Sequence, residues 1–219
     1  MKVRGPLLTV GAVVVLGVAI LLVNMSQETE PAPQTRQAAQ AVASAPAPST
    51  ARPAPPTPPP PQFPAKADYV GKIPTAGGTI TLEITVNGDA AVAYACDGNS
   101  VESWLRGSAV NGALNLANKD TTSRLDGSIQ GDSVTGTLWI GQKKWDFKAD
   151  PTQPPAGLYV YEDADVRASW IIDSSGNVTG VLRRPDGATE PAPQLSTEGS
   201  AFVEGRMVNA TRVQGDSNV

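Results

Sequence analysis

Apolar residues follow two different patterns along this chain. Between Leu7 and Val23 they form an almost unbroken run in which Thr9 is the one polar side chain. From residue 66 onward they occur in short runs of alternating apolar and polar positions, and most of these runs end at a turn dipeptide. The first pattern predicts a membrane-spanning helix and the second predicts β-strands, and no helical apolar period of useful length follows residue 25.

The N-terminal run is long enough to cross a bilayer. Residues 5–25 would form a helix of about 31 Å, against a hydrocarbon core of about 30 Å. Lys2 and Arg4 precede the run and two glutamates follow it, so the positive-inside rule predicts a cytoplasmic N-terminus and an extracytoplasmic remainder. Residues 1–25 are therefore interpreted as a cytoplasmic stub and a transmembrane signal-anchor helix.

A cleaved secretory signal peptide is the alternative interpretation of this run. Such a peptide has an apolar region of about 7–15 residues, with a small-x-small cleavage site close behind it. The run here is longer, and the first triplet of that kind, Ala41-Val42-Ala43, lies well downstream. We therefore expect an uncleaved, single-pass protein whose residues 7–23 contact the lipid bilayer of the cell membrane.

Residues 26–65 have the composition of a stalk. Most of the 20 prolines of the chain lie between Pro31 and Pro64, with Ala, Gln, Ser and Thr between them. Because proline has no N–H to donate and the segment has little apolar surface to bury, we expect a disordered, proline-rich spacer. Fully extended, residues 31–64 would reach roughly 100 Å. A docking segment for an aromatic groove is the alternative.

Residues 66–150 have the pattern of an antiparallel β meander. Thr79–Val86 alternates aliphatic with polar residues, which predicts a strand with one buried face. Asn87-Gly88 and Asn111-Gly112 are strong hairpin dipeptides because both positions accept positive φ. Eight consecutive strands joined by tight turns are typical of a small closed barrel or a barrel-like sandwich. The eight predicted strands are 69–73, 79–86, 90–96, 101–110, 113–117, 124–129, 134–140 and 143–149.

Residues 151–219 contain further strands after the proline-rich break at Pro151–Pro155. We predict strands at 158–161, 166–172 and 178–182. The segment 202–213 is either one bent strand or a hairpin around Glu204-Gly205. The pattern leaves open whether this part forms a second subdomain or continues the first sheet. The fold class is all-β in either case.

Composition excludes several kinds of function. The net charge is −4, with no cluster of lysines and arginines, which argues against a nucleic-acid partner. The chain has no histidine, so Ser-His-Asp triads and histidine-based zinc sites are impossible. Its single cysteine, Cys96, cannot form a disulfide within the chain and is too far from the apolar run to carry a lipid.

Some polar residues resemble parts of known sites, but each has a simpler interpretation. Cys96 ends a strand without a nearby base and is expected to be a small buried hydrophobe. Asp97–Ser100 and Asp173–Asn177 are rich in oxygen ligands but lack the ligand spacing of a calcium loop, so we interpret them as hairpin turns. A charged turn between two strands accounts for three further carboxylates, which are Glu162, Asp163 and Asp165.

Lysines and tryptophans are the remaining candidates for chemistry. A Ser-Lys dyad would use Lys119, Lys143 or Lys144, but no motif marks its serine. Aromatic side chains of a barrel either fill its core or line an apolar ligand pocket, and both interpretations stay open here. The four tryptophans, all in predicted strands, are Trp104, Trp139, Trp145 and Trp170. We predict no catalytic residue, no metal ligand and no cofactor.

Several short sequence motifs resemble those of a known group of proteins. They accompany the Ala/Pro/Gly-rich stalk and comprise Tyr69–Gly71, Cys96–Gly98, Pro155–Tyr159, Trp170–Asp173 and Gly180–Leu182. With them the chain resembles the proline-rich, single-pass conserved membrane proteins of mycobacteria and related actinobacteria. The resemblance implies a location in the cell envelope and assigns no activity. The positive-inside rule is what predicts that the β-domain lies on the periplasmic side.

These observations favour a non-catalytic, membrane-anchored envelope protein. Its outer β-domain would act as an accessory or binding module for another envelope or membrane-complex component. The first alternative is a carrier or sensor that encloses a small apolar ligand such as a lipid in its barrel. The second is a hydrolase that works without histidine. A cavity lined by Trp and Leu would favour the carrier, a filled interior the accessory module, and a polar cleft with converging carboxylates the hydrolase.

Overall fold

The structure, a computed structural model, describes residues 61–219, and all their regular elements are β-strands. The predicted transmembrane helix and nearly all of the predicted stalk lie outside the described residues. Within residues 61–219, no helix combines the length and the apolar character that crossing a membrane requires.

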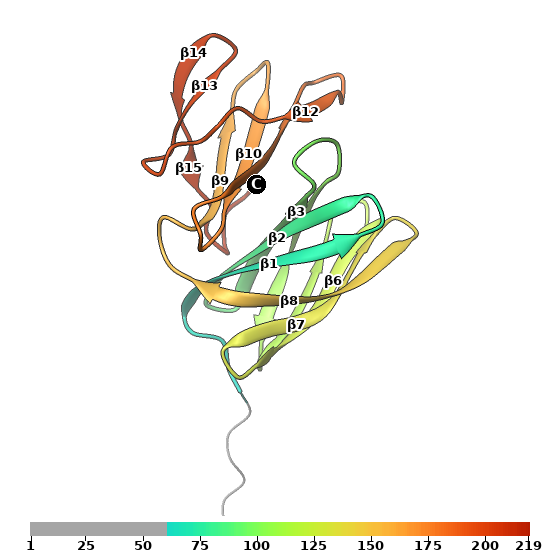
Figure 1. The fold of residues 1–219 in the computed structure, drawn as a ribbon. Coiled ribbons are helices and arrows are strands. Elements are labelled where there is room, and N and C mark those ends of the chain that lie inside the picture. Colours follow the sequence, from blue (N-terminus) through green and yellow to red (C-terminus); the bar gives the residue numbers. More distant parts are fainter. Residues whose placement is uncertain (1–60) are drawn as a thin grey trace, which may run out of the picture. The chain divides into compact units, whose positions relative to one another are not determined.

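The first eight strands form a closed antiparallel barrel in which each strand pairs with its neighbours in the sequence (Figure 1). Strands β1 and β8 close the barrel by pairing with each other. The prediction of an all-β fold with an antiparallel eight-stranded barrel is therefore confirmed. The strands are β1 (Lys66–Thr75), β2 (Gly78–Asn87), β3 (Ala90–Cys96), β4 (Glu102–Val110), β5 (Ala113–Ala117), β6 (Ser123–Gln130), β7 (Ser133–Ile140) and β8 (Lys143–Thr152).

The two Asn-Gly dipeptides form different turns. Asn111 and Gly112 lie between β4 and β5 with φ of 52° and 73°, the positive pair that a type I′ hairpin requires. Asn87 instead stays in β2 and pairs with Ala90, so the β2–β3 loop begins at Gly88. The prediction is wrong by one residue there, because the strand pairing extends through Asn87 and leaves only Gly88 with positive φ.

Inward-facing apolar side chains meet across the barrel and fill its interior. Small residues on β3 lie opposite large ones on β2, since Ala93 pairs with Ile84 and Ala95 pairs with Leu82. An eight-stranded barrel has an interior just wide enough for its side chains. The buried cluster consists of Tyr69, Ile73, Ile80, Leu82, Ile84, Val86, Ala91, Ala93, Ala95, Leu105, Ala109, Leu114, Leu116, Leu125, Val134, Leu138, Phe147 and Ala149.

The end of the barrel where the chain enters is covered by an aromatic residue. Phe63, just before β1, meets the ring of Tyr69 edge to face, with 6.2 Å between the ring centroids. Phe63 and Ala67 are partly buried against the barrel core. The entry segment therefore packs against the bottom of the barrel.

Three glycines allow neighbouring strands of the barrel to approach closely. Gly71, Gly107 and Gly136 occupy inward-facing positions of β1, β4 and β7, each two residues from core residues on either side. At each of them an added Cβ would overlap a backbone carbonyl oxygen of the adjacent strand. Glycine at such positions lets strongly curved strands cross without a side chain between them.

A second set of strands follows the barrel. It forms a five-stranded sheet in the order β12-β11-β10-β9-β15 and a separate β13–β14 hairpin. Its strands are β9 (Gly157–Glu162), β10 (Arg167–Ile172), β11 (Val178–Arg183), β12 (Thr189–Pro191), β13 (Ser200–Val203), β14 (Arg206–Asn209) and β15 (Thr211–Arg212). The segment 202–213 thus contains a hairpin turn at Glu204-Gly205, which is one of the two predicted alternatives, and then an additional short strand.

The five-stranded sheet is buried on both faces. On one face Trp170 and Leu182 form a core with residues of the β13–β14 hairpin. On the other face Leu158, Ile171 and Val181 pack against outward-facing residues of barrel strand β3. Figure 1 shows the sheet beside β2 and β3. The sheet and the barrel therefore share an apolar interface.

This interface overturns the expectation that β2 has only one buried face. Thr81, Glu83 and Thr85, on its predicted polar face, are as buried as the aliphatic residues between them. Thr81 lies 3.3 Å from the Thr179 hydroxyl of β11. The prediction is wrong because a second sheet, rather than water, covers the outside of β2.

The close strand approach at Gly107 can be tested with alanine. We expect Gly107→Ala to lower the free energy of unfolding by about 2 kcal/mol or more, because the new methyl group must displace the backbone of β5. Gly77→Ala is the matched control, since nothing lies within 4 Å of a Cβ at that position. Urea unfolding of both variants measures the difference. Equal stability of the two would contradict the proposed crowding.

Candidate functional site

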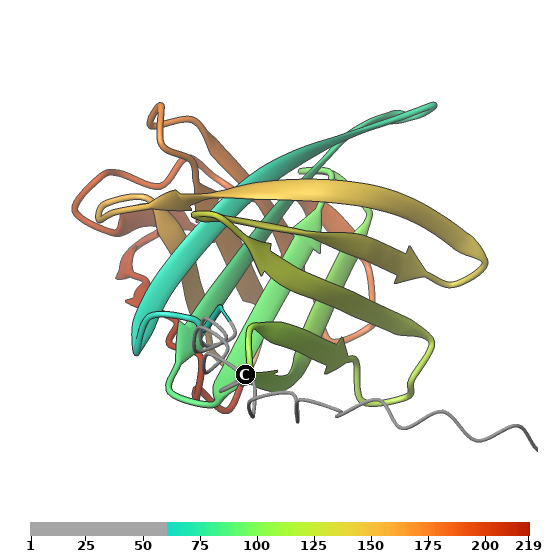
Figure 2. The ribbon, with the colours of Figure 1, turned by 90° about the horizontal axis from the view of Figure 1, so that it is seen from below.

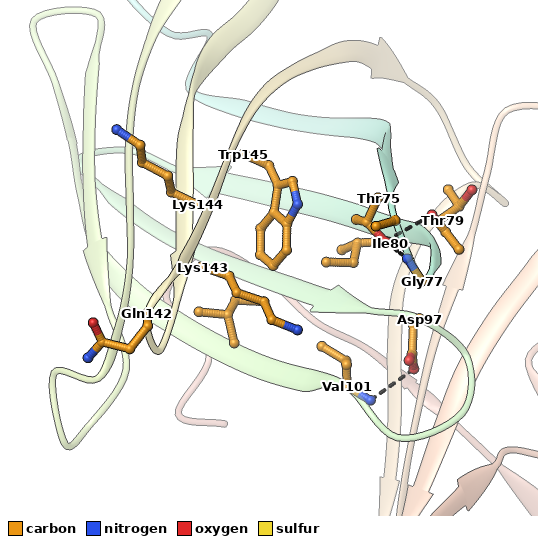
Figure 3. Close-up of a pocket in the computed structure, with 13 residues that line it drawn as sticks. Thr75, Gly77, Thr79, Ile80, Asp97, Val101, Gln142, Lys143, Lys144 and Trp145 are labelled. Carbon is orange, nitrogen blue, oxygen red and sulfur yellow. Dashed lines mark hydrogen bonds between the residues drawn. The ribbon is translucent and has the colours of Figure 1, made fainter.

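The barrel has a hollow at the end opposite Phe63, with a volume of about 580 Å³ (Figure 3). The β1–β2 turn, the β3–β4 loop and the β7–β8 turn surround it. Its apolar wall is formed by Ile80, Val101, Ile140 and Trp145. We call this space the mouth hollow. Its volume is within the usual range for small-molecule sites, about 300–1,000 Å³.

The mouth hollow lies where the barrel closes only in part. Strands β1 and β8 pair from Asp68 to Val70 on β1 and from Asp150 to Thr152 on β8. The pairing does not continue to Thr75, at the other end of β1. Figure 2 shows the β1–β2 turn and the β7–β8 turn set apart from each other. The diverging strands leave space that the core does not fill.

The first residues of β8 point to alternate sides of the strand. Trp145 is half-buried and packs against the top of the barrel core. Lys143 belongs to the same face of β8 as Trp145, and Figure 3 shows its side chain beneath the indole ring, reaching toward Val101. Lys144 also borders the hollow but belongs to the opposite face of β8, and Figure 3 shows its amine directed away from Trp145. Within residues 61–219, neither lysine forms an ion pair.

Asp97 is the one carboxylate that lines the mouth hollow. Its Oδ1 accepts hydrogen bonds from the backbone N–H groups of Asn99, Ser100 and Val101 at 2.8–2.9 Å. Partial burial opposes ionisation, but these bonds outweigh it and lower the pKa of the Asp97 carboxyl. Asp97 thus organises the β3–β4 loop, which agrees with the interpretation of this segment as a turn.

The Asp173 segment is also a turn. Its carboxylate accepts hydrogen bonds from the backbone N–H groups of Ser175 and Asn177, and it forms an ion pair with Lys72 of β1 at 2.8 Å. Partial burial opposes ionisation, yet the bonds from Lys72 and Asn177 lower the pKa of Asp173 to about 2. This turn between β10 and β11 is thereby fixed to the barrel.

Asp163 organises the turn between β9 and β10. It accepts hydrogen bonds from the hydroxyl of Tyr161, at 2.7 Å, and from two backbone N–H groups, and it pairs with Arg206 at 2.8 Å. The bond from Tyr161 is the largest of the causes that lower the pKa of Asp163 to about 2. Glu162 and Asp165 flank it, and Glu162 pairs loosely with Arg167 at 3.5 Å. In the part of the chain that the structure describes, no three Cys, Asp or Glu side chains gather as a metal site would need.

Two carboxylates, one partly and one fully buried, lie between the barrel and the sheet. Arg212 of β15 contacts Asp68 of β1 at 3.0 Å, the carbonyl oxygen of Ala156 at 2.8 Å and the hydroxyl of Tyr159 at 3.1 Å. Glu83 of β2 is fully buried nearby, and neither of its carboxylate oxygens has a hydrogen-bond partner. Arg212 therefore links the barrel, the chain leaving it and the sheet.

Burial raises the pKa of the Glu83 carboxyl well above its usual value. The negative charge of Asp68 raises it further, whereas the positive charge of Arg212 lowers it. These are the converging carboxylates that a hydrolase would need, but Glu83 is completely inaccessible to solvent. A substrate cannot reach Glu83 without separating the barrel from the sheet, so the two carboxylates have the geometry of a structural contact.

A second polar contact joins the barrel and the sheet. Glu102 of β4 accepts a hydrogen bond from the indole N–H of Trp104 at 3.0 Å and pairs with Arg183 of β11 at 2.8 Å. The guanidinium of Arg167 lies over the Trp104 ring, 4.4 Å from its centroid. These contacts pair a buried carboxylate with one arginine and an aromatic ring with another, which is typical of a fixed contact between two parts of a protein. We call Glu102, Trp104, Arg167 and Arg183 the barrel–sheet junction.

Cys96 is fully buried in the apolar interface between the barrel and the sheet. Burial raises the pKa of its thiol from 9.0 to about 12. Because the thiolate is the reactive form of cysteine, the side chain has neither the charge nor the access of a nucleophile. The prediction that Cys96 is a small buried hydrophobe is confirmed.

The four tryptophans all lie in strands but have different surroundings. Trp170 is fully buried in the sheet and donates its indole N–H to the carbonyl of Pro193 at 2.7 Å. The guanidinium of Arg124 lies over the ring of Trp139 of β7, with 4.0 Å between the guanidinium carbon and the ring centroid. Trp104 belongs to the junction, and only Trp145 lines the mouth hollow. The core interpretation thus applies to Trp170, and the pocket interpretation applies to Trp145.

Lys119, the third candidate lysine, lies in the loop between β5 and β6, which meets the β7–β8 turn where the Gly141 N–H donates to the carbonyl oxygen of Thr122 at 3.1 Å. Lys119 does not line the mouth hollow. Across residues 61–219, no hydrogen bond joins a serine hydroxyl to a lysine amine. The sequence pattern did not single out Asp68, Glu83 or Arg212. The only sign of their role was one glutamate in a row of threonines on β2.

A second exposed feature is the outer side of the β13–β14 hairpin. Phe202 of β13 and Met207 of β14 are directly paired across the hairpin and are 61% and 70% exposed. Among residues 61–219, the only other large hydrophobic side chain with comparable exposure is Val110, at 41%. We call Phe202 and Met207 the hairpin patch. The sequence placed Phe202 in a strand without indicating which side faces solvent.

Comparison with other proteins gives no further assignment. The chain matches no protein-family model, no curated protein and no solved structure. The site must therefore be interpreted from its own geometry.

The buried position of Glu83 predicts how stability depends on pH. A carboxyl whose pKa is raised by folding stabilises the folded state below its unfolded pKa of about 4.3, and this contribution is lost as the pH rises through the folded pKa. Glu83→Gln cannot ionise. We expect its free energy of unfolding to be close to wild type near pH 4 and to exceed wild type increasingly as the pH rises above about 4.3.

Urea unfolding across the pH range measures this difference. Glu198→Gln is the control, because Glu198 is exposed and its pKa is lowered, so its removal changes the pH dependence of stability only in acidic solution and leaves a constant difference from wild type at higher pH. A Glu83→Gln variant whose stability falls as steeply as wild type when the pH rises above about 4.3 would show that Glu83 is not held neutral.

The burial of Cys96 predicts an unreactive thiol. We expect Ellman's reagent to react with Cys96 at least about a hundredfold more slowly in the folded protein than in denaturant. The variant Gln142→Cys adds an exposed cysteine at the β7–β8 turn and serves as the control. One thiol of this variant should react immediately and the second only on unfolding. Immediate reaction of both would contradict the packing of the sheet on β3.

Proposed function

We propose that this protein is a non-catalytic accessory module of the cell envelope that binds another envelope or membrane-complex protein. In this proposal residues 7–23 anchor the chain in the cell membrane with the N-terminus in the cytoplasm. Residues 26–65 then separate the bilayer from the β-domain, which lies outside the cytoplasm. The hairpin patch is the surface that contacts the partner.

The single observation that supports a protein partner is the exposure of Phe202 and Met207. A phenylalanine and a methionine that are paired across a hairpin and exposed by more than half offer an apolar contact without loss of folded structure. Aromatic residues and methionine are enriched in the cores of protein interfaces, where a few such anchors supply most of the binding energy.

Charged residues surround the hairpin patch and suit the rim of an interface. Arg206 is paired with Asp163, and Glu204 is paired with Arg184 at 2.7 Å. These pairs are partly exposed, so they contribute little to stability but restrict which surfaces can approach. An apolar centre with a polar rim is the usual arrangement of a binding surface.

A membrane anchor would make a small interface sufficient. If the module and its partner are held at the same membrane, binding is effectively intramolecular, and a weak contact then gives high occupancy. The resemblance to the actinobacterial membrane proteins favours the envelope location. The filled barrel core supports the accessory module over a carrier that encloses a lipid in its interior.

Site-specific photo-crosslinking in native membranes tests the proposal. A benzoylphenylalanine replaces Phe202 in the full-length chain, and a second version carries it at Val110, the matched exposed apolar position on β4. We expect one dominant envelope protein to be crosslinked from position 202 and not from position 110. Adding Met207→Ser should reduce the yield of this adduct about tenfold or more, the effect expected for an interface anchor.

The outcome must depend on the hairpin patch to support the proposal. The same crosslinked proteins from both positions, or an adduct whose yield is unchanged by Met207→Ser, would contradict a docking role for these side chains. Thermal unfolding of each variant is the control for folding, because both residues are exposed and their replacement should leave the core intact.

A further inference from the structure

We propose that the mouth hollow binds an amphipathic anion, that is, an apolar ring or acyl chain ending in a carboxylate or phosphate. The apolar part would lie against Trp145, and the anionic group would contact the amine of Lys143. This site is distinct from the hairpin patch, and the proposal does not depend on the binding of a protein partner.

The apolar half of the site is already formed in the structure. Trp145 provides a half-buried indole, and Ile80, Val101 and Ile140 line the same hollow from β2, the β3–β4 loop and β7. The floor beneath them is the packed core of the barrel, so a ligand would be held at the mouth without entering the interior. A concave site with an apolar wall and few polar groups is typical of small-molecule binding.

The charge around the hollow favours an anion. Lys143 extends beneath the indole ring, where no acidic partner neutralises it within the described residues (Figure 3). The one carboxylate of the lining, Asp97, is engaged by three backbone N–H groups of its own loop. An incoming anion therefore meets a free ammonium, whereas the Asp97 charge is already hydrogen-bonded.

The position of the hollow leaves it accessible. The chain enters the barrel at Phe63 and runs along β1 to the opposite end, a distance of about 33 Å for ten residues of strand. The mouth hollow opens at that opposite end, between the β1–β2 and β7–β8 turns. The hollow is therefore remote from Phe63, near which the described part of the chain begins.

Titration of the full-length chain in nanodiscs of zwitterionic lipid tests the proposal. Octanoate is the probe, and octanamide is its uncharged counterpart of nearly the same size and shape. We expect saturable binding of octanoate by calorimetry, with a change in tryptophan emission that is absent in Trp145→Phe. Trp145→Ala should weaken the binding of both probes, because it removes the apolar wall that they share.

The lysine substitutions provide the matched pair. Lys143→Gln should weaken octanoate binding roughly fivefold, the upper range for a solvent-exposed ion pair, and should leave octanamide binding unchanged. Lys144→Gln removes the same charge from the next residue of the same strand, but the Lys144 side chain belongs to the opposite face and its amine is directed away from Trp145. It should leave the binding of both probes close to wild type. Both lysines are exposed, so neither variant should affect folding.

Two sources of the ligand can be separated in the same system. In discs that contain an anionic phospholipid, weaker octanoate binding by the wild type but not by Lys143→Gln would identify a lipid headgroup and its chain as the occupant. Unchanged octanoate binding in those discs would identify a free amphiphile.

The proposal is overturned by any of three results. These are a failure of octanoate binding to saturate before micelles form, an equal effect of Lys143→Gln and Lys144→Gln, and unchanged binding by Trp145→Ala. None of these results affects crosslinking from position 202, so the two binding surfaces are tested separately.

Discussion

The packing of the second sheet across the outside of β2 and β3 is the interaction on which the rest of the structure depends. In an isolated barrel these strands would have one face in water. Here Tyr94 and Cys96 of β3 meet Ile171 and Val181 in an apolar layer. Polar groups caught in this layer must be matched, so Arg212 pairs with Asp68, and burial favours the neutral form of Glu83. The layer also removes the Cys96 thiol and the Glu83 carboxyl from any reaction with solvent-borne molecules.

Alternation of apolar and polar residues was sufficient to predict the barrel, because each strand pairs with its neighbour in the sequence and each has one face in a common core. It could not predict the burial of Thr81, Glu83 and Thr85, since that depends on a sheet formed almost 80 residues later. Strand β12 was also missed, because three residues ending in Pro191 have no detectable period and are ordered by pairing with β11.

For the candidate surfaces too, the sequence predicted the face of a strand but not what covers that face. The sequence placed Trp145 with Phe147 on one face of a strand, and that face is the inner one. The sequence could not reveal that β1 and β8 diverge near Trp145. This divergence leaves Trp145 beside the mouth hollow, whereas Phe147 is buried in the barrel core. The exposure of Phe202 and Met207 was likewise hidden, because these hydrophobic residues could as well have faced the core that Val203 and Val208 join.

A filled barrel changes where binding can take place. The interior is occupied by its own side chains, and the buried polar groups hold the barrel to the sheet, so an interaction with another molecule has to use the surface. The two apolar features exposed there have different shapes. Phe202 and Met207 project from a hairpin and can enter a pocket of a larger partner, whereas the mouth hollow is concave and receives a small molecule. Because they lie on different sheets, with the barrel–sheet junction between them, occupancy of one leaves the other accessible.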